Sequence, residues 1–600
     1  MIQASLAQHV LKALQAAQNA QELTLESLPT EIKIETPRDP SHGDYASNIA
    51  MSLAKSAKLP PRKLAEMLLP HLQGPLFQAV SIAGPGFINF RLSQAWLLQQ
   101  LQGLIQADQG FGQQSNGDPE TYLIEYVSAN PTGPLHFGHG RWAVLGDCLA
   151  RLMRLAGYSV KTEFYINDTG AQVNNLGASV RACYFQAAQA AGVELSGEAT
   201  ELIESYLKEK VIIQVIEGVV DPISEKVPHP KVEKGPVRFY HGPYIEDLGK
   251  ELYKNQQTAQ LDAESSYFSD YAKSAILAEQ QAQLKQFGVI FDEWFPESRL
   301  HHEQAVAEAL KHLKESGKTY EQDGALWFRS TDYGDDQDRV LVKQTGSNTY
   351  FANDIAYHWD KLRRGHTRLI NLWGADHHGY IARMSAAIQA LGYPKEALQV
   401  LLGQMVNLFR NGEKVRMSKR TGDMISFGEV LEEVGTDATR FLLMQRSADV
   451  TLDFDLELAK SQNSENPVFY VQYAHARICS IFRNAANLQA YDANAWPEAS
   501  LEALVAPEER ILLLKLLSYP DELKFAAAQR EPHRLATYAQ DLAALFHSFY
   551  KQCRVLFEKE DVTAEEIALS LARLNLVKAT QVVLRNVLVD VFGISAPEVM

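Results

Sequence analysis

Residues 122–139 decide the fold and read Tyr122-Leu-Ile-Glu-Tyr-Val-Ser-Ala-Asn-Pro-Thr-Gly-Pro-Leu-His-Phe-Gly-His139. A short β-rich run opens this stretch, and a turn-rich segment follows it. Apolar side chains then recur at helical spacing and predict an amphipathic helix: Trp142, Leu145, Leu149, Leu152 and Leu155. Gly157 is typical of a helix C-terminus, and residues 159–166 alternate like a strand. The order strand, loop, helix, strand is the βαβ unit of a doubly wound nucleotide-binding domain, so we predict an α/β fold.

The rest of the chain is expected to form further domains, because 600 residues are too many for one core. Residues 1–112 have the pattern of a small α/β module, and a Gly-, Gln- and Ser-rich linker is expected at 110–118. Residues 113–460 are predicted to form the nucleotide-binding domain, interrupted by a mostly helical insertion at about 170–330. Residues 461–600 are helical in pattern to the end, which predicts a bundle.

The charge distribution limits what kind of nucleic-acid surface the protein could have. The net charge is −16, whereas a generic nucleic-acid binder is usually basic. Residues 1–110 are neutral, residues 461–600 carry −4 and the middle of the chain carries −12. A nucleic-acid partner would therefore need local basic or stacking surfaces, because no global positive field attracts it.

Composition also bears on location and on metals. No apolar run approaches the roughly 20 residues of a membrane span, so we expect no membrane partner. The N-terminus has helical spacing and lacks the basic start and apolar block of a signal peptide. The cysteines are scattered and form no metal-type pair: Cys148, Cys183, Cys479 and Cys553. We expect reduced thiols in a cytoplasmic protein and no protein-bound metal.

The first motif with chemical meaning is His136-Phe-Gly-His139, between the predicted strand and helix. Backbone N–H groups and the helix dipole attract phosphate at such a position, and Gly138 allows close approach of a nucleotide. Two imidazoles three residues apart could donate to an α-phosphate whose charge grows in the transition state. Taken alone, ordinary turn histidines explain the pattern equally well.

The second motif is Lys414-Val-Arg-Met-Ser-Lys-Arg420, which lies between Gly412 and Gly422. Residues 410–420 contain five cationic side chains: Arg410, Lys414, Arg416, Lys419 and Arg420. The flanking glycines favour a mobile loop. A mobile cation that closes on departing pyrophosphate would catalyse nucleotidyl transfer. A solvated basic loop is the commoner explanation of this motif by itself.

Together the two motifs resemble the HIGH and KMSKS signatures of class I aminoacyl-tRNA synthetases, in the right order. Phe137 stands for the usual Ile, and Arg416 and Arg420 replace the outer Lys and Ser, while Lys419 is present. Finer matches to arginyl-tRNA synthetases span nearly the whole chain: 43–50, 84–89, Glu125-Tyr-Val-Ser-Ala-Asn130, Tyr165-Ile-Asn-Asp-Thr-Gly-Ala-Gln172, 338–343, 349–358, Trp373-Gly-Ala-Asp-His-His-Gly379, 469–477 and 593–600. The resemblance implies a Rossmann-type class I domain with a helical insertion, an N-terminal module for the tRNA elbow and a C-terminal anticodon-binding bundle.

The resemblance also implies which residues bind each substrate. Catalysis would depend on His136, His139 and Lys419. ATP, carrying Mg²⁺, would be bound by these three and by Pro131, Gly133, Leu135, Gly138, Met417 and Ser418. L-Arginine would be bound by Glu125, Ser128, Asn130, Tyr350, Asp354, Asp376 and His378. Carboxylates suit a planar, permanently charged guanidinium because each accepts two hydrogen bonds at once.

Each assignment to the arginine site has a plainer alternative. Without the resemblance, Asp354 is better explained as a helix cap or surface ion pair, and Glu125 as a satisfied strand carboxylate. Asp376, His377 and His378 could also suggest metal ligands, although this is the less favoured interpretation.

For tRNA, the candidates are aromatic and cationic side chains that could stack on unpaired bases. They are Tyr470, Tyr473, His475 and Arg477 in the bundle, and Phe87 and Asn89 in the N-terminal module. Core packing explains at least half of the bundle residues equally well, and a hydrophobic turn explains the other two.

The implied activity is that of a monomeric arginine–tRNA ligase whose activation step requires bound tRNA(Arg). A class I synthetase for another amino acid, such as cysteine, is one alternative, but it would normally have zinc-ligand cysteines. A non-catalytic tRNA-binding relative is another, but it would be free to lose the histidines or Lys419.

Overall fold

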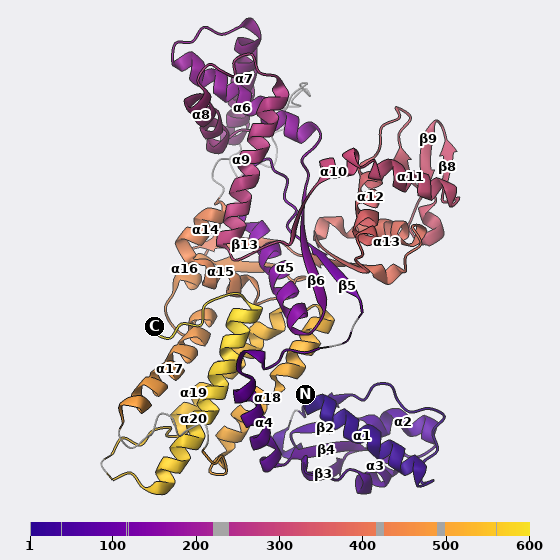
Figure 1. The fold of residues 1–600 in the computed structure, drawn as a ribbon, viewed down its shortest axis with the longest axis vertical. Helices are drawn as coiled ribbons and strands as arrows, with labels where there is room; N and C mark the ends of the chain where they lie inside the picture. The colour runs from indigo at the N-terminus through magenta and orange to yellow at the C-terminus, as the bar shows by residue number, and fades with distance from the viewer. Residues whose placement is uncertain are drawn as a thin grey trace. The chain divides into compact units, whose positions relative to one another are not determined.

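The computed structural model divides the chain into two compact units (Figure 1). One unit comprises residues 117–154 and 158–466, and the other comprises 1–116, 155–157 and 467–600. The structure describes residues 2–37, 39–115, 117, 119–219, 239–415, 425–488, 499–559 and 561–600.

The first unit is built on a five-stranded parallel sheet, which confirms the predicted doubly wound α/β fold. The strand order is β12-β11-β5-β6-β7, so the chain builds outward from β5 on one side and later returns to its other side. The strands and the first crossover helix are β5 (Thr121–Glu125), α5 (Phe137–Leu155), β6 (Ser159–Ile166), β7 (Glu293–Pro296), β11 (Arg368–Gly374) and β12 (Leu398–Gly403). Ligands of such sheets bind beyond the carboxyl ends of the strands where the order reverses, here between β5 and β11.

Two insertions interrupt this sheet. The first is helical and lies between β6 and β7: α6 (Ala171–Ala190), α7 (Gly197–Val219), α8 (Pro243–Gln256) and α9 (Ser265–Gln286). The second lies between β7 and β11: α10 (Glu297–His302), α11 (Ala305–Glu315), β8 (Thr319–Gln322), β9 (Ala325–Phe328), β10 (Arg339–Val342) and α12 (Tyr350–Arg363). The range of about 170–330 expected for one insertion therefore also contains β7, a strand of the main sheet.

The unit is completed by α13 (Ile381–Ala390) and by a small sheet with three short helices. These elements are β13 (Val406–Arg410), β14 (Glu413–Val415), α14 (Phe427–Val434), α15 (Thr436–Leu443), β15 (Leu452–Asp455) and α16 (Leu456–Lys460). Arg141 of α5 is 2% exposed and donates to the carbonyls of Gln404 (2.8 Å) and Ser447 (2.9 Å). This buried guanidinium fastens the helix that follows the histidine motif to the chain around the small sheet.

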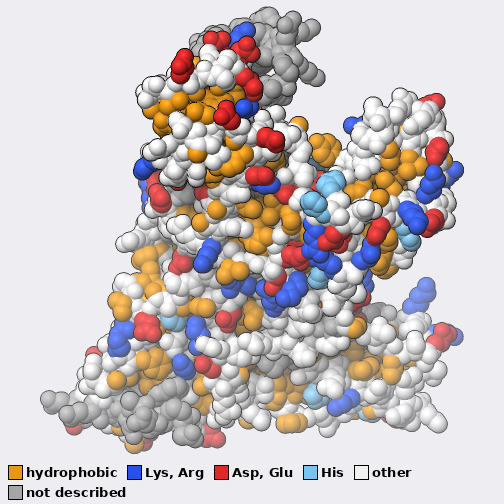
Figure 2. Space-filling model, turned by 45° about the horizontal axis from the view of Figure 1, so that its top comes forward, with side chains coloured by type: hydrophobic (Ala, Val, Ile, Leu, Met, Phe, Trp, Pro, Cys, Tyr) orange, Lys and Arg blue, Asp and Glu red, His pale blue; other side chains and the backbone are white. Residues whose placement is uncertain are grey.

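Charged side chains of both signs are interspersed on the face of the molecule drawn in Figure 2. No single continuous basic field covers that face, in keeping with the net charge of −16. A polyanionic partner must therefore be recognised by individual, well-placed cations and stacking surfaces.

The second unit contains the N-terminal module and the helical bundle. The module has an antiparallel sheet of order β1-β2-β4-β3, and α-helices accompany it. The strands are β1 (Ile34–Glu35), β2 (Tyr45–Ser47), β3 (Phe77–Ala83) and β4 (Phe87–Leu92). The helices are α1 (Ile2–Asn19), α2 (Ile49–Ala57), α3 (Pro61–Leu68) and α4 (Gln94–Ala107). The bundle comprises α17 (Pro467–Asn487), α18 (Pro507–Gln529), α19 (His533–Gln552) and α20 (Ala564–Arg585).

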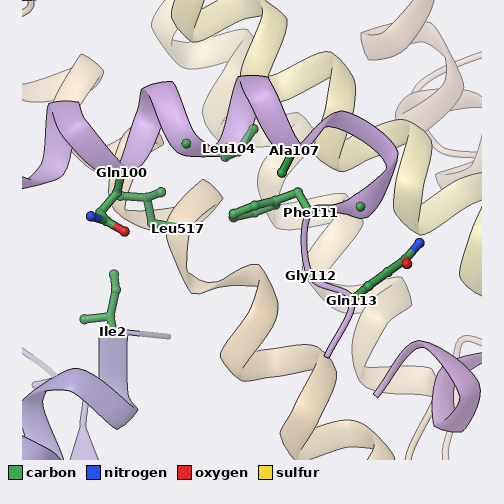
Figure 3. A pocket seen from close by; sticks show the side chains of 10 residues that line it. Ile2, Gln100, Leu104, Ala107, Phe111, Gly112, Gln113 and Leu517 are labelled. Atoms are coloured by element: carbon green, nitrogen blue, oxygen red, sulfur yellow. The ribbon is translucent and has the colours of Figure 1, made fainter. Parts of the chain in front are cut away.

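The start of the predicted linker is bound to the bundle and lines a cavity of about 260 Å³ (Figure 3). Phe111 stacks on Tyr519, with ring centroids 6.2 Å apart. Asn586 Nδ2 donates to the carbonyls of Asp108 (3.1 Å) and Phe111 (3.2 Å). Gly112 lies so close to Tyr519 that an added Cβ would come within 2.5 Å of the ring. Packing against the bundle therefore orders a segment whose composition is typical of a flexible connection.

One helix among the described residues, Ala564–Val591, is long and apolar enough to cross a membrane by length and composition alone. It is α20 with its π-helical continuation, and 61% of its most apolar window is buried within the protein. A core helix of a bundle has this composition because neighbouring helices cover it on several sides.

Candidate active site

The strand-to-helix loop begins with a strained turn. β5 ends at Glu125. Two residues further on, Val127 (φ 67°) and Ser128 (φ 42°) have left-handed backbone conformations. This conformation is costly for a β-branched residue and persists only where surrounding contacts enforce it. Ser128 Oγ donates to Glu125 Oε1 (3.0 Å) and accepts from the Tyr165 backbone N–H (3.2 Å). The turn thus brings two of the predicted arginine-site residues into direct contact.

The second oxygen of Glu125 faces a buried lysine. Lys361 Nζ lies 2.5 Å from Glu125 Oε2, and the side chains are 1% and 12% exposed. Burial is the largest single influence on the pKa of Glu125 and acts to raise it, but the positive charge of Lys361 and the hydrogen bonds from Lys361 and Ser128 together hold this pKa below its usual value. Glu125 is therefore ionised and neutralised from within the protein, which the sequence did not indicate.

Helix α12 contributes several site residues because they recur at helical spacing along it. The Thr349 side chain caps the helix by accepting from Ala352 N–H (3.3 Å). Asp354 and Lys361 follow at intervals of about one and three turns from the start, so both lie on the face toward the sheet. Tyr350, the first helical residue, lies one turn before Asp354, and its side chain is 84% exposed.

A cluster of three carboxylates lies beside the end of β5. Asp354 accepts a hydrogen bond from the Tyr380 hydroxyl, and its pKa is raised to about 7 by burial and by the charges of Glu125 and Glu297. Glu297 is 5% exposed and accepts from Asn353 Nδ2 (3.1 Å). Lys361 neutralises Glu125, whereas no lysine or arginine of the described residues pairs with Glu297 or Asp354, so these two acids form a site suited to a cationic ligand.

Sequence reasoning missed Glu297, although a signal for it was present. It is the first residue of α10, directly after the edge strand β7. Asn167, with its amide nitrogen turned toward Glu297, donates to Glu297 Oε2 (2.9 Å), and Asp168 accepts from Ser298 N–H (2.9 Å). The Asn167-Asp168 pair lies within the quoted stretch 165–172, and such a pair at a strand's carboxyl end needs polar partners from elsewhere in the chain.

Other predicted arginine-site residues lie at the surface. Asp376 and His378 belong to a 3₁₀ turn (Ala375–Tyr380) after β11, and both are exposed. In the described part of the chain neither side chain hydrogen-bonds to the carboxylate cluster, and no group of three or more His, Cys, Asp or Glu residues could hold a metal ion. Asn130 is exposed, and its amide donates to Gln172 (3.0 Å).

The loop between residues 130 and 135 is supported by the helical insertion. Gln280 of α9 is 1% exposed and donates to the carbonyls of Gly133 (2.9 Å) and Asn130 (3.2 Å). Tyr244 of α8 donates to the Thr132 carbonyl (3.0 Å). These contacts fix the backbone of Pro131, Gly133 and the buried Leu135, and they were not predicted, because they join residues more than 100 positions apart.

The two motif histidines stack at the beginning of α5, with ring centroids 3.6 Å apart and an interplanar angle of 21°. His136 N–H donates to His139 Nδ1 (3.2 Å), so the proton of a neutral His139 ring is on Nε2. Gly140 is required for close packing, because an added Cβ would come 2.5 Å from the Phe427 ring.

The segment that follows the lysine-containing motif lies beside these histidines. Met417, Ser418 and Lys419 lie outside the described residues, together with the rest of 416–424. Ser426 forms a β-bridge with His136, and Phe427 N–H donates to the Leu135 carbonyl (3.1 Å). Residues next to the two motifs, nearly 300 positions apart in the sequence, are thus hydrogen-bonded to each other.

The predicted tRNA-binding residues of the bundle differ in exposure. Tyr470, Tyr473 and Arg477 are half-buried, and Arg477 both donates to the Tyr473 hydroxyl (2.7 Å) and lies over its ring (4.8 Å). His475 is 3% exposed and bonds the Pro597 carbonyl (2.9 Å), which gives it a structural role in holding the C-terminal segment. In the N-terminal module, Phe87 is half-buried and Asn89 is 5% exposed within the sheet.

A class I aminoacyl-tRNA synthetase is defined here by the parallel sheet, by the stacked histidines at the start of α5 and by the pairing of Ser426 with His136. Comparison with known families agrees, because residues 100–480 match the model of the tRNA synthetases class I (R) catalytic domain. Residues 4–92 match the arginyl-tRNA synthetase N-terminal domain, and residues 471–600 match the DALR anticodon-binding domain. The chain belongs to the arginyl-tRNA synthetase family.

Individual relatives support the assignment over the whole length. The arginine–tRNA ligase of Heliobacterium modesticaldum is 44% identical over 599 residues, covering 98% of each chain. That of Geobacillus kaustophilus is 45% identical over 594 residues, covering 98% of this chain and 97% of its own. The solved arginyl-tRNA synthetase of Thermus thermophilus is 24% identical, covers 100% of both chains and superposes with a TM-score of 0.70, which shows a shared fold.

Proposed function

We propose that this enzyme activates L-arginine with ATP and transfers it to the 3′-terminal adenosine of tRNA(Arg) through the residues described above. The observation that carries the proposal is the carboxylate cluster of Glu125, Glu297 and Asp354 at the carboxyl end of β5. It lies at the reversal of strand order, where α/β sheets bind their ligands, and at the start of the loop that leads to His136 and His139.

Within this cluster, we assign the guanidinium to Asp354 and Glu297. A guanidinium presents a fork of N–H donors that matches carboxylate oxygens in pairs. Glu125 is already neutralised by Lys361, so with Ser128 and the nearby Asn130 it is better suited to orient the α-ammonium. Tyr350 would pack on the substrate's methylene groups, and Asp376 or His378 would contact the ribose or the arginine at the rim.

The same arrangement explains selection of arginine over lysine. Lysine's ammonium is a compact point charge that cannot pair with two carboxylates in the fork geometry. Buried acceptors left without partners cost enough free energy to discriminate by several powers of ten without an editing site. The raised pKa of Asp354, about 7, means that a close cation is needed to stabilise its charged form.

ATP would be held along the loop of Pro131, Gly133 and Leu135 and at Gly138, and Met417 and Ser418 would be further ATP-binding residues. Arginine's carboxylate oxygen attacks the α-phosphorus, and the bond to the pyrophosphate oxygen breaks, which gives arginyl-adenylate and Mg²⁺-bound pyrophosphate. His136 and His139 would stabilise the charge that develops on the α-phosphate, and Lys419 that on the leaving group. The 2′-hydroxyl oxygen of the terminal adenosine then attacks the carbonyl carbon, the bond from this carbon to the phosphate oxygen breaks, and AMP leaves with the hydroxyl proton transferred to its phosphate.

For tRNA, we assign the half-buried Tyr470, Tyr473 and Arg477 to stacking on anticodon bases, and Phe87 to a base of the elbow. Asn89 and His475 could contribute only after some rearrangement, because they are 5% and 3% exposed. We further propose that the enzyme works as a monomer in the cytoplasm. Its four cysteines are free and buried, which suits a reducing compartment.

The test is to measure pyrophosphate exchange and tRNA charging with each amino acid, in the presence and absence of tRNA. We expect turnover with arginine only, and activation only when tRNA is bound. Turnover with cysteine would assign the enzyme to another amino acid, and no turnover with any amino acid would make the chain a non-catalytic relative.

A further inference from the structure

A second pocket, of about 300 Å³, lies where the starts of α12 and α13 meet β10. Its lining includes two arginines and an exposed tyrosine: Arg339, Thr349, Tyr350, Phe351, Tyr380 and Arg383. None of the substrate roles assigned above accounts for the two cations.

The two arginines differ in what neutralises them. Arg339 donates to both oxygens of Asp335 (2.8 and 3.0 Å) and also to Asp336, so its charge is satisfied within the protein. Among the described residues, no carboxylate forms an ion pair with Arg383 and no acceptor takes a hydrogen bond from it. Its Nε is buried without an acceptor. Its guanidinium instead lies over the rings of Tyr380 (4.9 Å) and Phe351 (5.7 Å).

A cation held in this way is suited to binding an anion. Stacking on two aromatic rings orients the guanidinium plane and restricts its rotamers while leaving its donors unused. No acidic side chain of the described residues pairs with this guanidinium, so its terminal N–H groups can donate to an anion from outside the chain. The middle of the chain carries a net charge of −12, and no general positive field could serve in its place.

The position of Arg383 identifies the kind of anion. The guanidinium of Arg383 lies over the Tyr380 ring, and the Tyr380 hydroxyl donates a hydrogen bond to Asp354. The Tyr380 side chain therefore contacts both the pocket and the carboxylate cluster. Arg383 would repel the substrate's guanidinium, which the acidic side attracts. The phosphates of ATP are assigned to the His136 loop, whereas the 3′ strand of tRNA must reach the activated arginine.

We propose that Arg383 forms an anion subsite for a backbone phosphate of the single-stranded 3′ end of tRNA as this strand enters the arginine pocket. The guanidinium fork binds two phosphate oxygens, and the aromatic support holds it in place before the strand arrives. This inference rests on the proposed function, because it presupposes a tRNA whose terminal adenosine is charged at the carboxylate cluster.

The test compares Arg383→Gln with Arg329→Gln as a matched control. Arg329 belongs to the same insertion and lies over a tyrosine ring, Tyr320 (4.8 Å), but it does not line the pocket. We expect Arg383→Gln to raise the dissociation constant of tRNA about tenfold and to lower the slope of its logarithm against log[salt] by about 0.7. The control should change neither quantity, and the KM values for arginine and ATP should stay within about twofold in both variants.

Two further arms make the result decisive. Arg383→Lys keeps the cation, so it should retain the salt slope while losing part of the affinity, which a purely structural role would not produce. Wild-type enzyme and Arg383→Gln should bind tRNA lacking its 3′-terminal nucleotides equally well. An unchanged salt slope in Arg383→Gln, or an effect confined to the KM for ATP, would overturn the assignment. Failure of the wild-type enzyme to charge arginine would instead refute the proposed function.

Discussion

The buried pair of Glu125 and Lys361 provides the sharpest test of how the site is built. Lys361→Met removes the cation while keeping a side chain of similar length. The ion pair is 2.5 Å long, and its side chains are 12% and 1% exposed, so no water replaces the lost partner. Breaking a buried pair in this way costs about 3–5 kcal/mol, because it leaves an uncompensated charge in the interior.

Replacing Glu125 should lower the free energy of unfolding by a similar amount, whereas replacing Glu125 and Lys361 together should lower it much less. Glu125→Gln leaves Lys361 buried without its counter-ion, so we expect a comparable loss of unfolding free energy. The double variant removes both charges, and replacing a whole buried pair is often nearly neutral. We therefore expect a coupling energy of about 3 kcal/mol or more in the double-mutant cycle.

Tryptophan fluorescence during urea unfolding measures this cycle, because five of the seven tryptophans lie in the unit that holds the pair. Arg363 and Glu308 offer a matched control, since they pair at 2.6 Å from the same helix but are 51% and 52% exposed. Their cycle should give no more than about 1 kcal/mol. Additive losses in the Glu125 and Lys361 cycle would show that the two charges do not stabilise each other.

Further predictions concern substrate affinity, pH, catalysis and packing. Glu125→Gln and Asp354→Asn should each raise the arginine KM in charging assays by at least about tenfold, since each removes a charged acceptor; an unchanged KM in both would place them outside the pocket. The pKa of Asp354 is about 7, above its ordinary value, so the free carboxyl is largely protonated below neutrality. Because bound arginine favours the ionised form of Asp354, arginine binding should release a proton and become tighter as the pH rises through 7. Calorimetry in buffers of different protonation heat would detect this proton release, and Asp354→Asn should abolish it. His136→Ala and His139→Ala should each lower kcat by about 10²–10³ at a nearly constant arginine KM, and a change confined to KM would contradict a transition-state role. Gly146→Ala should lower the urea midpoint markedly, because its Cβ would come 2.2 Å from a buried tyrosine ring; a wild-type midpoint would mean that the helix shifts freely.

The sequence was sufficient for the parts of the fold that depend on local periodicity. The strand before the histidine motif, the helix after it and the following strand were all predicted, and they are β5, α5 and β6. Apolar spacing determines which face of each element is buried, and this property is encoded within about 20 residues.

The site could be predicted only in part because its contacts are long-range. Lys361 contacts Glu125 across 236 positions, and neither spacing nor composition connects them. Gln280 supports the Gly133 carbonyl from 147 positions away, through an insertion whose path the sequence does not specify. Motifs alone also do not predict which side chains are exposed: His475 is of a residue type that can stack on bases, but it is 3% exposed.

The charges of this site explain why an acidic protein can act on two polyanions and a cation. The cationic side chain of arginine is attracted by Asp354 and Glu297, while Lys361 keeps Glu125 from adding a third uncompensated charge. Without Lys361, the cluster would repel the α-carboxylate of arginine and the phosphate that this carboxylate must attack. A buried lysine is therefore needed for the chemistry as well as for stability, and Lys361→Met should slow activation even under conditions where the folded state remains fully populated.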